Sequence, residues 1–236
     1  MPKAHIEALV RALGFDPEGT HRQIGVDDDL PMEYPLVVYR MQGYCLTAVT
    51  PDLEEALDLL WEQPEERGPM ELLQPLLDHV DLQEDGAQLL HVTQQTLRPC
   101  PAPEGGVCRM LSQADAEALE QFLDALTIPE RVVGALDLKE GPCMGLFQDG
   151  RLWAAAGLRD FGEGLLDVTV STHPEARGRG LGRAVVAALC RDALEEGHLI
   201  QYRHDNTNPA SAALAAAVGF TPLATVEGVI LHFGEA

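Results

Sequence analysis

Apolar residues recur every three to four positions in some stretches of the first hundred residues and cluster in short runs in others. Segment 3–13 has its apolar residues on one side, which predicts an amphipathic helix. Two apolar runs, 36–40 and 44–49, flank residues 41–43, which is typical of a hairpin with a three-residue loop. Three more elements are expected in this half: a helix opened by Thr50 and Pro51, a helix near 70–80 and a strand near 88–93.

The second half alternates strands and helices in a regular order. Asp149-Gly150 lies between two apolar runs and predicts a tight hairpin. The expected elements are a strand at 107–110, a helix from Ser112, the hairpin strands 145–148 and 152–156, a strand at 164–172, a helix at 181–195, a strand at 199–202, a helix at 209–218, and a terminal strand pair at 220–224 and 228–233. This order indicates an α/β (α+β) fold with a central mixed sheet and helices on both faces.

Prolines and glycines gather near the middle of the chain. Segment 98–106 holds three prolines and two glycines, which disfavour both helix and strand. We therefore expect a small mixed α/β domain over residues 1–98, a linker at 99–106 and a second domain over 107–236. No catalytic motif is found in the first domain, and its role stays open.

The net negative charge of the chain limits which binding partners are expected. The formal net charge is −22, with the acidity concentrated in the first half. Such a surface repels phosphate, so nucleic acid and anionic membranes are not expected as partners. It favours a cationic acceptor such as a polyamine, an aminoglycoside or a basic peptide, although the acidity also has a plain explanation in solubility.

Five cysteines occur at wide spacing, with no CxxC pair. This favours free thiols in a reducing cytoplasm over a disulfide framework, and no spacing typical of a metal site is found. The N-terminus leads into an amphipathic stretch, and no run of about 18 apolar residues suggests a membrane span. We expect a cytoplasmic protein without a metal; a homodimer is possible, and the sequence leaves the oligomeric state open.

The most informative segment runs from Val170 to Ala184 and contains Arg177-Gly178-Arg179-Gly180-Leu181-Gly182-Arg183. It follows a predicted strand and enters a predicted helix through three glycines. Amides at a helix N-terminus lack intrahelical partners, and the helix dipole favours an anion there. Glycine allows a phosphate to approach the backbone closely. The three arginines add positive charge to an otherwise acidic protein.

Other phosphate-binding motifs do not fit this segment. Counting from Gly178, the dinucleotide pattern G-x-G-x-x-G would need a glycine where Arg183 stands. The Walker pattern needs a lysine that is absent.

A second motif follows, in which Asn208-Pro209 and Ser211 lead to Gly219-Phe220. With the arginine and glycine run, it makes the chain from 107 to 236 resemble the GNAT acetyltransferase superfamily. The run is similar to the family's (Q/R)-x-x-G-x-(G/A) loop.

The resemblance implies the following roles. The amides of residues 178–183 would hold the pyrophosphate of acetyl-CoA, assisted by Arg177. The strand edge at Val170, Ser171 and Thr172 would pair with the pantetheine arm, and an amide near Val170 would polarise the thioester carbonyl. Asn208 and Ser211 would bind acetyl-CoA from the other side. An amine would attack the thioester directly.

The sequence departs from the family pattern where catalysis is concerned. Many members carry a tyrosine seven residues after the asparagine to protonate the leaving thiolate, and Ala215 stands there in this chain. Tyr202 and His204 are substitutes to consider for this general acid. For the general base we consider Asp167 and Glu163, beside the reading that both are ordinary polar residues of the strand.

The functional hypothesis is an acetyl-CoA-dependent N-acetyltransferase acting on a primary amine of a small molecule or peptide. The alternative is a weak or inactive acyl-CoA-binding sensor or scaffold, suggested by Ala215. A third hypothesis makes the first half a degenerate copy of the same fold, although it contains no second phosphate loop.

Overall fold

The computed structural model describes residues 3–64, 66–77 and 81–232. It divides into two compact units. The first comprises residues 1–89, 204–207 and 223–236, and the second comprises 90–203 and 208–222. The chain therefore passes between the units several times, and each unit is described by itself.

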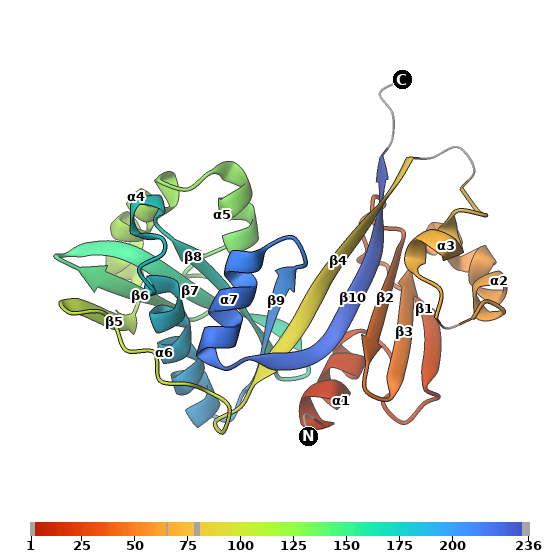
Figure 1. Cartoon of the computed structure of the whole chain (residues 1–236), viewed down its shortest axis with the longest axis horizontal. Helices are drawn as coiled ribbons and strands as arrows, with labels where there is room; N and C mark the ends of the chain where they lie inside the picture. Colours follow the sequence, from red (N-terminus) through yellow and green to blue (C-terminus); the bar gives the residue numbers. More distant parts are fainter. Residues whose placement is uncertain (1–2, 65, 78–80, 233–236) are drawn as a thin grey trace. The chain divides into compact units, whose positions relative to one another are not determined.

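The first unit is a sheet with short helices (Figure 1). Its elements are α1 (Lys3–Ala12), β1 (Arg22–Val26), β2 (Leu36–Met41), β3 (Tyr44–Val49), a 3-10 helix (Pro51–Ala56), α2 (Leu57–Trp61), α3 (Pro69–Leu73), most of β4 (Asp81–Val92) and most of β10 (Thr221–His232). The strand order is β1-β3-β2-β10-β4. Strands β1 and β3 are parallel, whereas β3, β2 and β10 are antiparallel.

The predicted helix at 3–13 and the predicted hairpin at 36–49 are confirmed. The segment after Thr50 begins as a 3-10 helix, and the Thr50 side chain forms no capping hydrogen bond. The predicted helix near 70–80 is found as the shorter α3, with residues 78–80 outside the described part.

The predicted terminal strand pair is wrong, because residues 221–232 form one strand. Gly228 does not interrupt β10: it pairs with Val37 of β2, in a ladder that runs from Ala224 to Gly228. A glycine signals a turn only when the backbone is not already held by a neighbouring strand. The C-terminal strand thereby joins the sheet of the first unit, so the compact units do not follow the contiguous division into 1–98 and 107–236.

The second unit contains the elements around the glycine-rich loop. They are β5 (Gly106–Met110), α4 (Ala116–Asp124), α5 (Ile128–Gly134), β6 (Cys143–Gln148), β7 (Arg151–Gly162), β8 (Leu165–Thr172), α6 (Leu181–Glu195), most of β9 (Leu199–Asp205) and α7 (Pro209–Val218). Segment 99–106 is irregular before β5, as predicted. It lies within the second unit, where Cys100 and Ala102 contact the core.

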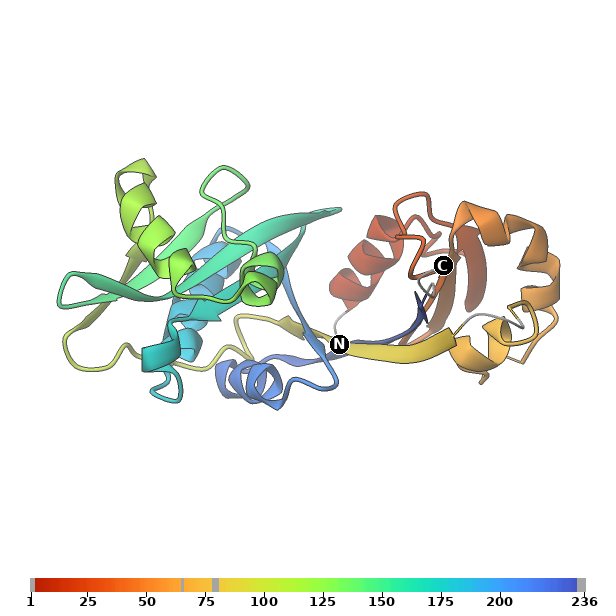
Figure 2. The same cartoon turned by 90° about the horizontal axis from the view of Figure 1, so that it is seen from above.

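The expected mixed sheet with helices on both faces is confirmed. Its order is β9-β8-β7-β6-β5, with β8 and β9 parallel and the other pairs antiparallel. Figure 2 shows α4 in light green on one side of these strands and α7 in dark blue on the other. Neighbouring residues of β7 divide between the faces: Ala154 and Ala156 pack with α6, whereas Ala155 packs with α4.

Alanine and glycine in the hairpin strands let α6 lie close to the sheet, and the Asp149-Gly150 turn adopts the positive φ values that the sequence suggests. Leu146, Ile200 and Leu181 are almost completely buried in the resulting core. Burial of side chains of this size stabilises a fold by about 1.5–3 kcal/mol each.

We predict that Leu146→Ala lowers the free energy of unfolding of the second unit by about 2–5 kcal/mol, because it leaves a cavity in this core. Urea denaturation followed by Trp153 fluorescence, in a Trp61→Phe background, measures this change. Val107→Ala in β5, where the side chain is 58% exposed, is the control and should change it by less than about 0.5 kcal/mol. Equal losses in the two variants would contradict the packing described here.

Candidate functional site

The chain passes from β8 to α6 through a loop that carries the glycines. Gly178 and Gly180 have φ values of 74° and 81°, in the left-handed region that favours glycine. Gly180 is the N-cap of α6, so the next amides have no intrahelical carbonyl to bind. The loop therefore presents unpaired amides and the positive end of a 15-residue helix at one place, which suits an anion.

The three arginines of the loop differ in what they contact. Arg177 donates to Glu130 Oε1 at 2.6 Å and to the Thr172 carbonyl at 3.3 Å. Arg179 donates to Gln148 Oε1 at 3.0 Å. Arg183 is exposed and forms no hydrogen bond or ion pair with any residue that the structure describes. Its guanidinium is therefore the one in this group whose donors are all available to a bound anion.

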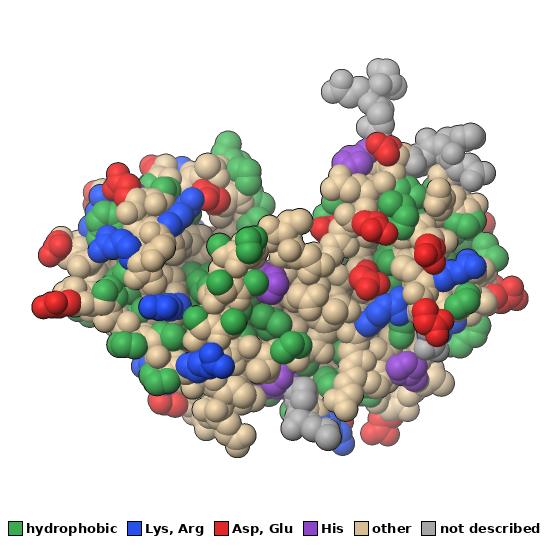
Figure 3. Space-filling view, viewed as in Figure 1, with side chains coloured by type: hydrophobic (Ala, Val, Ile, Leu, Met, Phe, Trp, Pro, Cys, Tyr) green, Lys and Arg blue, Asp and Glu red, His purple; other side chains and the backbone are tan. Residues whose placement is uncertain are grey.

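Figure 3 shows Lys, Arg, Asp and Glu side chains on both units, with several Lys and Arg side chains over the region of α4 and α6. Arg177, Arg179 and Arg183 place positive charge at the glycine loop of this acidic protein. Such a distribution favours an anionic ligand at the loop without making the rest of the surface attractive to anions.

Leu181 and Gly182 contribute to the loop through their backbone. The Leu181 side chain is buried in the core at 1% exposure. A Cβ on Gly182 would lie 2.9 Å from Thr172 Oγ1 and 3.0 Å from Leu214 Cδ1. Glycine at 182 thus allows α6 to lie against β8 and α7, so a side chain there would disturb packing as well as ligand binding.

Strands β8 and β9 are paired for only three residues. Their register pairs end at Asp167 and Gln201. Val170, Ser171 and Thr172, predicted to hold the pantetheine arm, continue to pair with β7 on the other side. Beyond Asp167, β8 therefore has an edge that does not pair with β9, as the resemblance implies for a site between the two strands.

On the α6 side of the sheet, Tyr202 of β9 contacts the first turn of α7. Its hydroxyl is hydrogen-bonded to Ser211 Oγ at 2.7 Å. Asn208 Oδ1 accepts a hydrogen bond from the Ser211 amide at 3.0 Å, as the N-cap of α7. Ala215, one turn after Ser211, is fully buried. The phenol of Tyr202 therefore reaches the face of α7 on which a tyrosine at 215 would stand. Burial raises its pKa, which keeps the phenol protonated.

Asp167 and Glu163, the two predicted bases, have different surroundings. Glu163 is exposed in the turn before β8, at a φ of 54°. Asp167 lies within β8, its Oδ1 is buried, and burial raises its pKa to about 6, against the opposing effect of the nearby Arg203 and Arg159. The structure does not bring the two carboxylates together, and only Asp167 has the environment of a group that exchanges protons near neutral pH.

Gln201 is a candidate that the sequence motifs did not identify. It is fully buried, and neither its Nε2 nor its Oε1 has a hydrogen-bond partner among the described residues. Thr169 Oγ1 is also buried without a partner. The sequence signal that could have identified Gln201 is a glutamine inside the otherwise apolar strand segment Leu199-Ile200-Gln201-Tyr202.

Helix α5 covers the face of β8 opposite to α6. Gly134 packs directly against the Ser171 side chain. A capping box joins Thr127 to Glu130, which also binds Arg177 of the glycine loop. Helix α5 is thereby connected to both the loop and the strand. Its outer surface is apolar, with Ile128, Val132 and Val133 more than 70% exposed.

A hollow of about 320 Å³ lies near the start of β7 and is lined by Phe122, Arg151 and His173, among others. Arg151 Nη2 is 2.7 Å from His173 Nε2, and the His173 amide donates to the Trp153 carbonyl. Burial, followed by the charge of Arg151, lowers the pKa of His173. A neutral His173 that accepts from Arg151 is consistent with a structural role.

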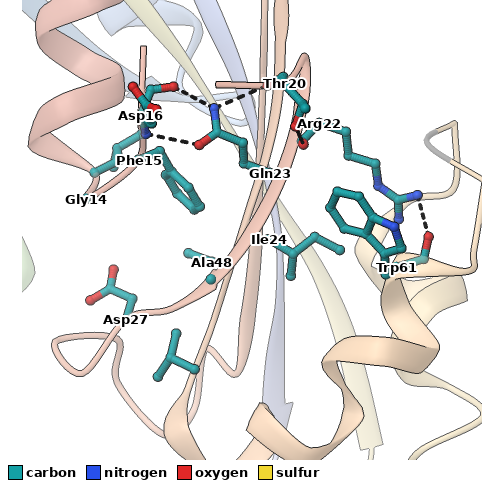
Figure 4. Close-up of a pocket in the computed structure, with 13 residues that line it drawn as sticks. Gly14, Phe15, Asp16, Thr20, Arg22, Gln23, Ile24, Asp27, Ala48 and Trp61 are labelled. Carbon is teal, nitrogen blue, oxygen red and sulfur yellow. Dashed lines mark hydrogen bonds between the residues drawn. The ribbon is translucent and has the colours of Figure 1, made fainter. Parts of the chain in front are cut away.

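The first unit has its own cavity, of about 440 Å³, beside β1. Figure 4 shows Phe15 and Trp61 on opposite sides of Ile24 there. Arg22 donates at 2.7 Å to the carbonyls of Leu60, Trp61 and Gln63, so its guanidinium is used in holding α2 against β1. The remaining charges of the cavity are carboxylates, so it does not suit a phosphate.

No group of three or more His, Cys, Asp or Glu side chains is arranged for a metal ion within the described ranges. None of the helices in the described part is long and apolar enough to cross a membrane.

Residues 109–220 match the model of the acetyltransferase (GNAT) family. None of the curated proteins matches the chain. A GNAT-family acetyltransferase from Novosphingobium aromaticivorans has a similar structure: its TM-score is 0.50 at 21% identity, over 78% of this chain and 82% of that one.

Two further solved structures are similar over much of their length. An acetyltransferase of the GNAT family from Colwellia psychrerythraea has a TM-score of 0.51 at 18% identity, over 81% of this chain and 78% of that one. A GCN5-related N-acetyltransferase-like protein from Streptococcus suis has a TM-score of 0.50 at 16% identity, over 88% and 87%. At these identities the likeness establishes the fold alone.

We predict that Asp167→Asn stabilises the protein at neutral pH. The folded-state pKa of about 6 exceeds the unfolded value of about 3.9, so the wild type loses stability as pH rises between these values, by up to roughly 2–3 kcal/mol. The asparagine variant lacks this loss. Its advantage in urea denaturation should grow by about 1 kcal/mol between pH 5 and pH 7.5.

Asp192→Asn, on the exposed surface of α6, controls for the loss of one negative charge. An advantage of Asp167→Asn that stays constant with pH, or a loss of stability at pH 7.5, would contradict the environment assigned to Asp167.

Proposed function

Because residues 109–220 belong to the acetyltransferase (GNAT) family, we propose that the chain is an N-acetyltransferase that moves an acetyl group from acetyl-CoA to a primary amine. The observation that carries this proposal is the loop at the start of α6. It combines two glycines at positive φ, the unpaired amides of the first helical turn and the unpaired Arg183.

The loop fits the pyrophosphate of acetyl-CoA in charge and in space. The amides of residues 178–183 supply neutral donors, and Arg183 supplies a charged one. A Cβ added at Gly178 would have no other atom within 4 Å, so the space beside this glycine is open. Charge-assisted hydrogen bonds are about twice as strong as neutral ones, which makes Arg183 the largest single side-chain contribution we expect.

The bound acetyl-CoA would supply an activated thioester, and the residues on both faces of the sheet would handle the protons. On the α5 side, Asp167 would accept a proton from the amine. A carboxyl group with a pKa of about 6 is largely ionised at neutral pH, and it is a stronger base than an exposed aspartate. Glu163, by contrast, is exposed in the turn before β8 and lies outside the strand.

On the α6 side, Tyr202 would donate a proton to the departing thiolate, in place of the tyrosine that Ala215 replaces. Three features support this role: burial raises the pKa of the phenol, the residue is 3% exposed, and its hydroxyl is hydrogen-bonded at 2.7 Å to Ser211 Oγ, one turn before Ala215 on α7. Asn208 and Ser211 would then act mainly by ordering the first turn of α7.

The alternative of a catalytically inactive acyl-CoA-binding protein rests on Ala215. It differs from the proposed enzyme in the role of Tyr202, because a sensor needs no general acid. An assay of thiol release from acetyl-CoA in the presence of amines decides between the two: release supports the enzyme, and binding without release supports the inactive protein.

We predict that Arg183→Glu weakens acetyl-CoA binding about 10- to 100-fold, since one charge-assisted contact worth about 1.5–3 kcal/mol is lost and a repulsive charge is added. Isothermal titration calorimetry measures this. Arg191→Glu makes the same charge change at an exposed position of α6, about 12 Å further along the helix, and should have little effect. Equal effects in the two variants would mean that acetyl-CoA binds elsewhere.

We predict that Tyr202→Phe lowers kcat by roughly 10²- to 10⁴-fold and leaves acetyl-CoA affinity unchanged, because it removes the acid and keeps the buried ring. Thiol release with an amine panel measures kcat, and calorimetry measures affinity. Tyr44→Phe, which removes a hydroxyl bound to the Pro17 carbonyl in the first unit, is the control. Full activity of Tyr202→Phe would exclude Tyr202 as the acid.

A further inference from the structure

Gln201 is unusual because a whole amide group is buried without any hydrogen bond to a described residue. Its exposure is 0%, and both Nε2 and Oε1 lack partners there. Burying a polar group without a partner destabilises the folded state. Most buried side-chain amides in folded proteins are hydrogen-bonded, so an exception needs an explanation, such as a ligand.

The unpaired groups near Gln201 share one face of the sheet. Gln201 pairs with Asp167 across β8 and β9, and paired residues of parallel strands point to the same side. Thr169 follows Asp167 by two positions and points to that side as well. Asp167 Oδ1 and Thr169 Oγ1 are also buried and unpaired. Three side chains from β8 and β9 thus present unused polar atoms at the position where these strands cease to pair, and Arg159 of β7, which pairs with Asp167, adds a buried and unpaired Nε on the same face.

The opposite face offers a contrast. Ile200 and Tyr202, on either side of Gln201, pack in the α6 core, and the Tyr202 hydroxyl is hydrogen-bonded. The unpaired atoms are therefore confined to the face that α5 covers.

We propose that Gln201, with Asp167 and Thr169, forms the binding site for the acceptor, and that the acceptor is a primary amine with a hydrogen-bond-accepting oxygen close to its nitrogen. The proposal rests on the N-acetyltransferase function proposed above. The carboxylate, the hydroxyl and the amide oxygen of Gln201 accept hydrogen bonds from the amine. The amide nitrogen can only donate, so it selects an oxygen on the acceptor. Amino-acid amides and peptide N-termini have this arrangement.

Acetyl transfer to glycinamide and to isobutylamine tests this selectivity. The two amines have the same number of heavy atoms and a similar branched shape, but only glycinamide carries the oxygen. Because they differ in basicity, the informative quantity is the change of their kcat/KM ratio on mutation. Gln201→Met should lower the ratio of glycinamide to isobutylamine at least tenfold, because a site built to bind an oxygen strongly prefers substrates that have one. An unchanged ratio overturns the proposal.

Gln94→Met is the matched control. Gln94 lies in the same unit, and its Nε2 donates to the Leu194 carbonyl at 3.0 Å. Gln94 is exposed, so its replacement should change the stability little and leave the amine ratio unchanged. Gln201→Met should instead keep or raise the melting temperature of the free protein, because it removes unpaired buried groups. A marked fall in that temperature would show that Gln201 has a structural partner and would overturn the proposal.

Titration with glycinamide, in the presence of desulfo-coenzyme A, separates this proposal from the function on which it rests. The side-chain amide signal of Gln201 in ¹⁵N-labelled protein, assigned by its loss in Gln201→Met, should shift with glycinamide and not with isobutylamine. A shift without any acetyl transfer would support the site and count against the enzyme. Acetyl transfer without a shift would support the enzyme and overturn the site.

Discussion

The second unit depends on the point at which β8 and β9 stop pairing. Adjacent strands normally satisfy each other's backbone groups along their length, and here the ladder ends at Asp167 and Gln201. The end of pairing leaves one edge of β8 available and places polar side chains of both strands at the same position. A fold can tolerate such unpaired groups only if packing elsewhere compensates. The dense contact of α6 with the alanine- and glycine-rich strands provides this compensation.

The two faces of the sheet differ in the polar groups that they carry around that point. The α6 face is an apolar core in which the one hydroxyl of Tyr202 is fixed by α7. On the α5 face, Asp167 Oδ1, the Thr169 hydroxyl and the Gln201 amide have no partner among the described residues. In the proposed transferase, the proton acceptor Asp167 and the proton donor Tyr202 would therefore act from opposite faces of the sheet.

Charge distribution complements this arrangement. The protein carries a net charge of −22, and yet the loop that precedes α6 contains three arginines. Two of them are held by Glu130 and Gln148, which orders the loop, and Arg183 remains available to an anion. The acidic remainder of the surface repels competing polyanions, so an anionic ligand is attracted to the loop and not to the rest of the protein.

Much of this could be predicted from the sequence, because the relevant signals are local. Helix α6 and helix α7 begin and end where the glycines, Asn208 and Pro209 indicate, and the Asp149-Gly150 turn joins the predicted strands. The glycine loop could be recognised because backbone conformation and helix ends are determined by neighbouring residues. Three features depended on contacts between residues far apart in the chain. Pairing with β2 and β4 makes 221–232 one strand, burial raises the pKa of Asp167, and the register of β8 and β9 places Gln201 beside Asp167. Register, burial and the absence of a hydrogen-bond partner are properties of the folded chain, so no local pattern could have determined them.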